Sequence, residues 1–163
     1  MGRQNNIEYL KKYYNGDISD AIKRLDKGEA VQYIVGNVDF YGYILDVNKN
    51  VLIPRRETEE LTEMVLKRIR AFSKPTISDV ATGSGAIAIT LSKKLNTNVY
   101  ASDISLDALE VASLNIKKNS ADVTILNGDM LKPYIDNKIK LDVIVSNPPY
   151  IMEDEKIEDI VKN

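Results

Sequence analysis

Residues 141–150 read Leu141-Asp142-Val143-Ile144-Val145-Ser146-Asn147-Pro148-Pro149-Tyr150. The aliphatic residues of this stretch predict a buried strand, and the two prolines end it, because proline has no backbone N–H to donate to a sheet. After the strand, an amide side chain, a backbone carbonyl and an aromatic ring lie in a conformationally restricted segment. Such a set suits a planar amide or amino group that is presented for chemistry. A plainer alternative stays open, since Asn-Pro begins many turns and tyrosine often packs in a core.

Apolar strands and helices alternate along the chain that leads to this stretch. We expect, in order, strand 76–80, helix 85–95, strand 98–102, helix 105–118, strand 122–126, a short turn-rich piece and strand 141–146. Strands separated by helices of this length predict βαβ units with right-handed crossovers. The fold class is therefore α/β, with a Rossmann-like, mostly parallel sheet and helices on both faces.

The first part of the chain has a different pattern. We expect two short helices over residues 5–14 and 17–27, a β-hairpin from Val31 to Ile53, and a helix between Pro54 and Pro75. The sequence therefore predicts two units. Residues 1–50 form a small appendage of helices with the hairpin, and residues 51–163 contain the parallel sheet.

Composition restricts the function classes. The net charge is −2, from 22 Lys+Arg and 24 Asp+Glu, so nucleic acid is disfavoured as the main partner. The chain has no cysteine and no histidine, which removes thiol chemistry, the commonest zinc ligands and the usual base near neutral pH, and we expect no metal site. No apolar run approaches the roughly 20 residues of a membrane span, and no signal peptide is visible. We expect a cytoplasmic protein without a membrane partner.

A run of small residues follows the first strand of the alternating region: Asp79-Val80-Ala81-Thr82-Gly83-Ser84-Gly85-Ala86. It lies where a strand turns into a helix, which is where an open α/β sheet binds nucleotide-like ligands, and small residues let the backbone approach the ligand. The run is not a phosphate-binding P-loop, because no Gly-Lys-Ser/Thr follows. A tight turn without a ligand is the alternative.

Acidic residues end the next two strands. Asp103 lies twenty positions after Gly83, where a carboxylate in this topology accepts hydrogen bonds from ribose hydroxyls, although it also suits an N-cap for the helix near Ser105. Gly128-Asp129 follows the third strand and places a carboxylate where an adenine amino group can be read; a turn explains it equally well in isolation. Three strand ends with small or acidic residues together predict a nucleotide-like site.

Taken together, these residues resemble the N5-glutamine methyltransferases that modify peptide chain release factors. The resemblance rests on Gln32-Tyr33-Ile34-Val35-Gly36, Phe40-Tyr41-Gly42, Val51-Leu52-Ile53-Pro54-Arg55-Arg56-Glu57-Thr58-Glu59, Asp79 to Ala88, Asp103-Ile104-Ser105, Gly128-Asp129 and Asn147-Pro148-Pro149-Tyr150-Ile151. Asn-Pro-Pro-Tyr alone indicates a class I methyltransferase acting on a planar nitrogen, DNA adenine enzymes included. The Phe-x-Gly hairpin followed by Ile-Pro-Arg-x-Glu-Thr-Glu is what resembles the glutamine enzymes in particular.

The resemblance implies S-adenosylmethionine as cofactor and a glutamine in the Gly-Gly-Gln loop of a release factor as substrate. It implies these cofactor-binding residues: Asp79, Ala81, Thr82, Gly83, Ser84, Gly85, Asp103, Asp129, Met130 and Asn147. Ala81 to Gly85 would surround the methionine end, Asp103 would accept the ribose hydroxyls, and Asp129 with Met130 would border the adenine.

The same resemblance implies the catalytic residues Asn147, Pro148 and Tyr150, and a substrate side formed by Asn147, Pro148, Pro149, Tyr150 and Phe40. Asn147 Oδ1 and the Pro148 carbonyl would accept the two hydrogens of the glutamine amide and hold its nitrogen in line with the methyl. Tyr150 and Phe40 would exclude water. No strong base is required, which agrees with the absence of histidine.

Three features depart from the family pattern, of which the mildest is Arg56 in place of a usual proline, since the helix start that follows is intact. Ala81 stands where the family usually has glycine, and its Cβ is obstructive if φ is positive. The chain also looks truncated at both ends, so the methyltransferase domain would be incomplete and strand 141–146 would be an edge open to self-association. Two alternatives therefore remain: a non-catalytic methyltransferase fragment, and an adenine-N6 nucleic-acid methyltransferase.

Overall fold

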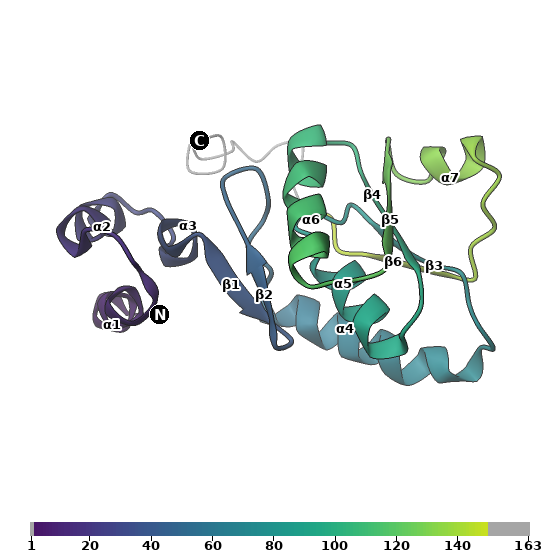
Figure 1. The fold of residues 1–163 in the computed structure, drawn as a ribbon, viewed down its shortest axis with the longest axis horizontal. Coiled ribbons are helices and arrows are strands. Elements are labelled where there is room, and N and C mark those ends of the chain that lie inside the picture. The colour runs from purple at the N-terminus through teal and green to yellow at the C-terminus, as the bar shows by residue number, and fades with distance from the viewer. Residues whose placement is uncertain (1, 150–163) are drawn as a thin grey trace.

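The computed structural model describes residues 2–149 (Figure 1). Its elements are, in chain order, α1 (Arg3–Tyr13), α2 (Ile18–Asp26), α3 (Val31–Val35), β1 (Asn37–Phe40), β2 (Tyr43–Asp46), α4 (Arg56–Arg68), the 3-10 turn η1 (Ile69–Ala71), β3 (Ile77–Val80), α5 (Ala86–Leu95), β4 (Val99–Asp103), α6 (Leu106–Lys118), β5 (Val123–Asn127), α7 (Lys132–Asp136) and β6 (Val143–Ser146). No helix in this part of the chain is long and apolar enough to cross a membrane.

Four parallel strands form the main sheet, in the order β5-β4-β3-β6. From β3 the chain steps outward through β4 to β5, and β6 then returns to pair with the other side of β3. The direction of the winding therefore reverses between β3 and β6, which opens a crevice at the carboxyl ends of these strands. The predicted α/β class with a parallel sheet is confirmed.

Helices cover both faces of this sheet. In Figure 1, α5 and α6 lie between the sheet and the hairpin, and α7 lies on the opposite face. The core on the α5 side is aliphatic: Ile69, Ile77, Ile87, Ala88, Leu91, Val99, Ala101 and Val145. On the opposite face, Tyr134 of α7 packs edge-on against Tyr100 of β4, with ring centroids 6.3 Å apart.

The hairpin β1-β2 turns through Tyr41-Gly42, whose φ angles are 56° and 85°. Two positive φ angles match the twist of a two-residue hairpin. Because a Cβ makes a positive φ costly, Tyr41 needs support. Glu59 at the start of α4 supplies it, since one carboxylate oxygen accepts a hydrogen bond from the Tyr41 N–H at 2.9 Å. The turn is thereby tied to α4.

The N-terminal part differs from the predicted one. Val31–Val35 forms helix α3, ended by Gly36 at φ 83°, and not the first strand of the hairpin. β-Branched residues favour strands, but tertiary packing overrides this preference here, since α1, α2 and α3 share a core that contains Leu10, Ala21, Val31 and Ile34. The hairpin is confined to residues 37–46.

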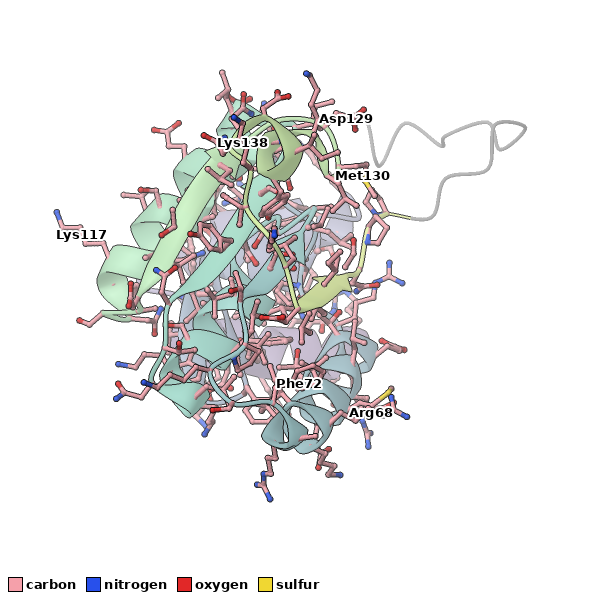
Figure 2. The ribbon with its side chains drawn as sticks, turned by 90° about the vertical axis from the view of Figure 1, so that its right-hand side faces the viewer. Arg68, Phe72, Lys117, Asp129, Met130 and Lys138 are labelled. Atoms are coloured by element: carbon pink, nitrogen blue, oxygen red, sulfur yellow. The ribbon has the colours of Figure 1, made fainter. Side chains whose placement is uncertain are left out.

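The helix after Pro54 is shorter than predicted. α4 ends at Arg68 and a 3-10 turn continues to Ala71, short of Pro75. Figure 2 shows Arg68 and Phe72 at the same end of the molecule, where Phe72 is half exposed. The apolar spacing that predicted a longer helix therefore includes a side chain that the core does not take up.

Candidate active site

A cleft of about 260 Å³ opens at the carboxyl ends of β3, β4 and β6. Its walls come from the loops after these three strands, from residues of the 50–54 segment and from Thr58 of α4. This is the reversal point of the strand order, where open α/β sheets bind their ligands. Many of the predicted site residues line it: Asp79, Ala81, Thr82, Gly83, Ser84, Asp103, Asn147 and Pro149.

The strand register explains why these residues meet. Val80 of β3 pairs with Ser102 of β4 on one side and with Ser146 of β6 on the other. The residues that follow therefore leave the sheet side by side, with Ala81 between Asp103 and Asn147. A hydrogen bond from Ser146 Oγ to the Val80 carbonyl, at 2.7 Å, holds β6 and β3 together at this level.

Asp79 is buried at the end of β3 and is only 1% exposed. Its Oδ2 accepts hydrogen bonds from Thr82 Oγ1 at 2.6 Å and from the Ala88 N–H at 3.1 Å. Its Oδ1 is buried and has no partner within residues 2–149. Burial raises the pKa of Asp79 from 3.8 to about 7, although the two hydrogen bonds act in the opposite direction. A cationic ligand group at Oδ1 would stabilise the ionised carboxylate.

The loop after Asp79 has an unusual backbone. Ala81, Gly83 and Gly85 have φ angles of 59°, 54° and 83°. A Cβ on Gly85 would also lie 3.3 Å from Ile89 and 3.4 Å from Ala112, so glycine is needed there for packing as well as for φ. Ala81 thus has the positive φ at which a Cβ is obstructive, and this departure from the family pattern carries a backbone cost.

Asp103 faces the same loop. Its Oδ2 accepts from the Gly83 N–H and its Oδ1 from the Ser105 N–H, both at 3.0 Å. The N-cap of α6 is Ser105, whose Oγ accepts from the Ala108 N–H at 3.2 Å, so the alternative capping role for Asp103 is wrong. Each carboxylate oxygen of Asp103 retains a lone pair for a ligand hydroxyl.

Asn147 leaves β6 beside the first turn of α4. Its Nδ2 donates a hydrogen bond to Thr58 Oγ1 at 2.8 Å. Thr58 itself is 7% exposed. Thr58 was not among the predicted site residues, because nothing local distinguishes it from the other residues of the segment Val51 to Glu59. The available signal was that this segment and Asn-Pro-Pro-Tyr belong to the same resemblance.

Other predicted site residues lie elsewhere. Phe40 is 1% exposed and packs with Leu45, Ala86 and Ile89, so its ring is a core group and the predicted substrate contact is not what this structure shows. Asp129 and Met130 are exposed and lie near each other (Figure 2), and neither is among the residues that line the cleft. Pro148 and Gly85 adjoin lining residues in the chain, and Tyr150 lies outside the described residues.

The sequence also did not indicate the apolar side of the cleft. Leu52 and Ile104 line it and are 50% and 69% exposed. Val51, next to Leu52, is buried against Ala108 and Val111 of α6, which fixes the 50–54 segment over the cleft. Two exposed aliphatic side chains in a ligand-sized cleft suit a flat apolar ligand surface. Within residues 2–149 no cluster of three or more acidic side chains is arranged to hold a metal ion.

The comparisons with known proteins agree with this geometry. The family described as Methyltransferase small domain matches residues 49–163. The release factor glutamine methyltransferase of Bacillus subtilis is 50% identical over 134 residues, which cover 79% of this chain and 46% of that protein. The same enzyme of Staphylococcus aureus is 47% identical over 138 residues, covering 84% of this chain and 49% of that protein. The chain thus spans about half the length of these curated relatives.

A solved structure shares the fold. The Pyrococcus abyssi tRNA (uracil-54, C5)-methyltransferase, in complex with S-adenosyl-L-homocysteine, superposes with a TM-score of 0.52 at 20% identity, over 69% of this chain and 28% of that chain. The resemblance to release factor glutamine methyltransferases that the motifs indicated is confirmed by the curated relatives.

Proposed function

The chain belongs to the methyltransferase small domain family, and we propose that the whole protein transfers a methyl group from S-adenosylmethionine to the side-chain amide nitrogen of a glutamine in a peptide chain release factor. The observation that carries this proposal is the position of Asn147. It lies at the carboxyl end of β6, at the reversal point of the sheet, with its Nδ2 bonded to Thr58. The oxygen of its amide is then the end that can accept a hydrogen bond from a substrate.

The residues of the cleft fit the cofactor. S-adenosylmethionine has a cationic sulfonium and an ammonium group, and the buried Oδ1 of Asp79 lacks a partner in residues 2–149. The loop from Ala81 to Gly85 would hold the methionine end and Asp103 the ribose hydroxyls. Leu52 and Ile104 would contact the adenine face, with Asp129 and Met130 at its rim. When bound, the cofactor supplies an electrophilic methyl group.

Positioning is the main contribution of the chain's own residues. An amide nitrogen is a poor nucleophile, because its lone pair is delocalised into the carbonyl. Asn147 Oδ1 and the Pro148 carbonyl would each accept one hydrogen of the substrate amide and so orient its nitrogen. Such positioning contributes about 7–11 kcal/mol in favourable cases. The proton leaves the nitrogen after methyl transfer, so no strong base is needed. Tyr150 would exclude water from the site.

The N-terminal residues 1–50 would form the substrate-recognition side. In support, α1, α2 and α3 have a core of their own, separate from that of the sheet. Cytoplasmic location stays a prediction. So does self-association through the edge of β6, which within residues 2–149 pairs only with β3; light scattering of the purified protein would test it.

The test is mass spectrometry of a release factor after incubation with the full-length protein and S-adenosylmethionine. We expect one methyl group on the glutamine of the Gly-Gly-Gln loop. A matched adenine-containing DNA and a release factor with glutamine replaced by alanine serve as controls and should stay unmodified. Methylation of the DNA, with none on the release factor, would contradict the proposal.

A further inference from the structure

We propose that Thr58 is a positioning residue for methyl transfer, whose hydroxyl oxygen accepts a hydrogen bond from the Asn147 NH₂ group and so holds the amide oxygen toward the substrate. This role rests on the proposed function and adds a residue to it. Thr58 and Asn147 are 89 positions apart in the chain and come from α4 and from the end of β6. They meet at the cleft, which both side chains line.

The orientation of an asparagine amide matters, because its two ends have nearly the same shape and opposite hydrogen-bonding character. The oxygen only accepts and the NH₂ group only donates. The last torsion of the side chain is broad, so an unrestrained asparagine populates both orientations. A substrate amide that offers its own NH₂ needs the oxygen, and the flipped orientation would place two donors against each other. In the structure Asn147 Nδ2 donates to Thr58 Oγ1 at 2.8 Å, so Thr58 occupies the NH₂ end of the amide and Oδ1 is the end left for the substrate.

Thr58 is held well enough to serve this purpose. Its N–H donates to the Arg55 carbonyl at 3.0 Å, which closes the first turn of α4. It is buried, and as a β-branched residue it has a restricted χ1. The first turn of α4 fixes the backbone of Thr58, and the restricted χ1 limits where its hydroxyl can lie.

Helix α4 is in turn attached to the rest of the molecule from two sides. Leu61 and Val65 pack against the core of the sheet. Glu59, next to Thr58, accepts the hydrogen bond from the Tyr41 N–H in the hairpin turn. The Glu-Thr-Glu segment thus connects the hairpin to Asn147 through two neighbouring side chains.

The experiment compares Thr58→Val, Thr58→Ser and Thr62→Val in the full-length protein. Valine keeps the shape of threonine and removes the hydroxyl, and serine keeps the hydroxyl. Thr62→Val is the matched control, since Thr62 is also a buried threonine of α4, one turn later, whose hydroxyl bonds within the helix. We expect Thr58→Val to lower kcat on the release factor about tenfold, the rate equivalent of one ordinary hydrogen bond. The Kd for S-adenosylhomocysteine should change less than twofold, and the serine and Thr62 variants should retain kcat.

A spectroscopic readout completes the test. In NMR spectra, Thr58→Val should increase the exchange of the Asn147 Nδ2 protons with solvent, and Thr62→Val should not. An unchanged kcat in Thr58→Val, or an equal loss in Thr62→Val, would overturn the role of Thr58. If the unmodified protein leaves the release factor unmethylated, the proposed function fails, and the NMR result alone then decides whether Thr58 orients Asn147.

Discussion

Replacing Asn115 with alanine should lower the free energy of unfolding by about 2–3 kcal/mol. Asn115 is fully buried in α6. Its Oδ1 accepts from the Asp46 N–H at 2.7 Å, and its Nδ2 donates to the carbonyls of Asp46 and Ser84, both at 2.9 Å. Three hydrogen bonds at about 1 kcal/mol each give about 3 kcal/mol, and the better helix propensity of alanine offsets about 0.7 kcal/mol of this. Equilibrium urea unfolding followed by circular dichroism measures the difference.

The matched control is Asn119→Ala, one helical turn later. Asn119 also donates to the hairpin, to the Ile44 carbonyl at 3.1 Å, but it is only half-buried, so water can replace its bonds. We expect a loss below about 1 kcal/mol for this variant. Because Asn115 joins β2 to the loop that contains Ser84, its removal should also weaken binding of S-adenosylhomocysteine. Equal losses in the two variants would refute the view that Asn115 connects the hairpin to the cofactor loop.

Two further predictions concern the loop itself. The pKa of Asp79 is about 7 in the folded chain and 3.8 in the reference state. Between these values the folded protein retains a proton that the unfolded chain loses, so a rise in pH favours unfolding. Relative to Asp79→Asn, the free energy of unfolding should therefore fall by up to roughly 4 kcal/mol between pH 4 and pH 7. Parallel pH profiles of the two proteins in urea would contradict this. Ala81→Gly removes a Cβ at φ 59°. The relief of about 1–2 kcal/mol of backbone strain should exceed the cost of about 0.5–1 kcal/mol that comes from the greater conformational entropy of glycine in the unfolded chain. The thermal midpoint should therefore rise. A lower midpoint would show that the strain is absent.

The parallel sheet and the location of the cleft were predictable from the sequence. Apolar strands separated by helices of regular length leave few topologies, and in a parallel sheet the strand ends meet at one edge. Asp79, Asp103 and Asn147 each lie at or directly after the carboxyl end of such a strand, and all three line the cleft. Local pattern and topology were sufficient for these residues.

The remaining contacts depend on tertiary structure that no local pattern encodes. Val31–Val35 has strand-like residues and forms a helix because α1 and α2 bury one side of it. Phe40 resembles a site aromatic and is a core residue. Asn115 and Thr58 bond to partners 69 and 89 positions away, so their roles followed only from the assembled fold.

The most direct test of the account is the effect of Asn147→Ala on two quantities in the full-length protein: the rate of release factor methylation, measured by mass spectrometry, and the Kd for S-adenosylhomocysteine, measured by calorimetry. Because Asn147 is proposed to orient the substrate amide, methylation of the glutamine should be abolished while cofactor affinity stays largely intact. A variant that methylates the glutamine at a rate comparable to the unmodified protein would contradict the account.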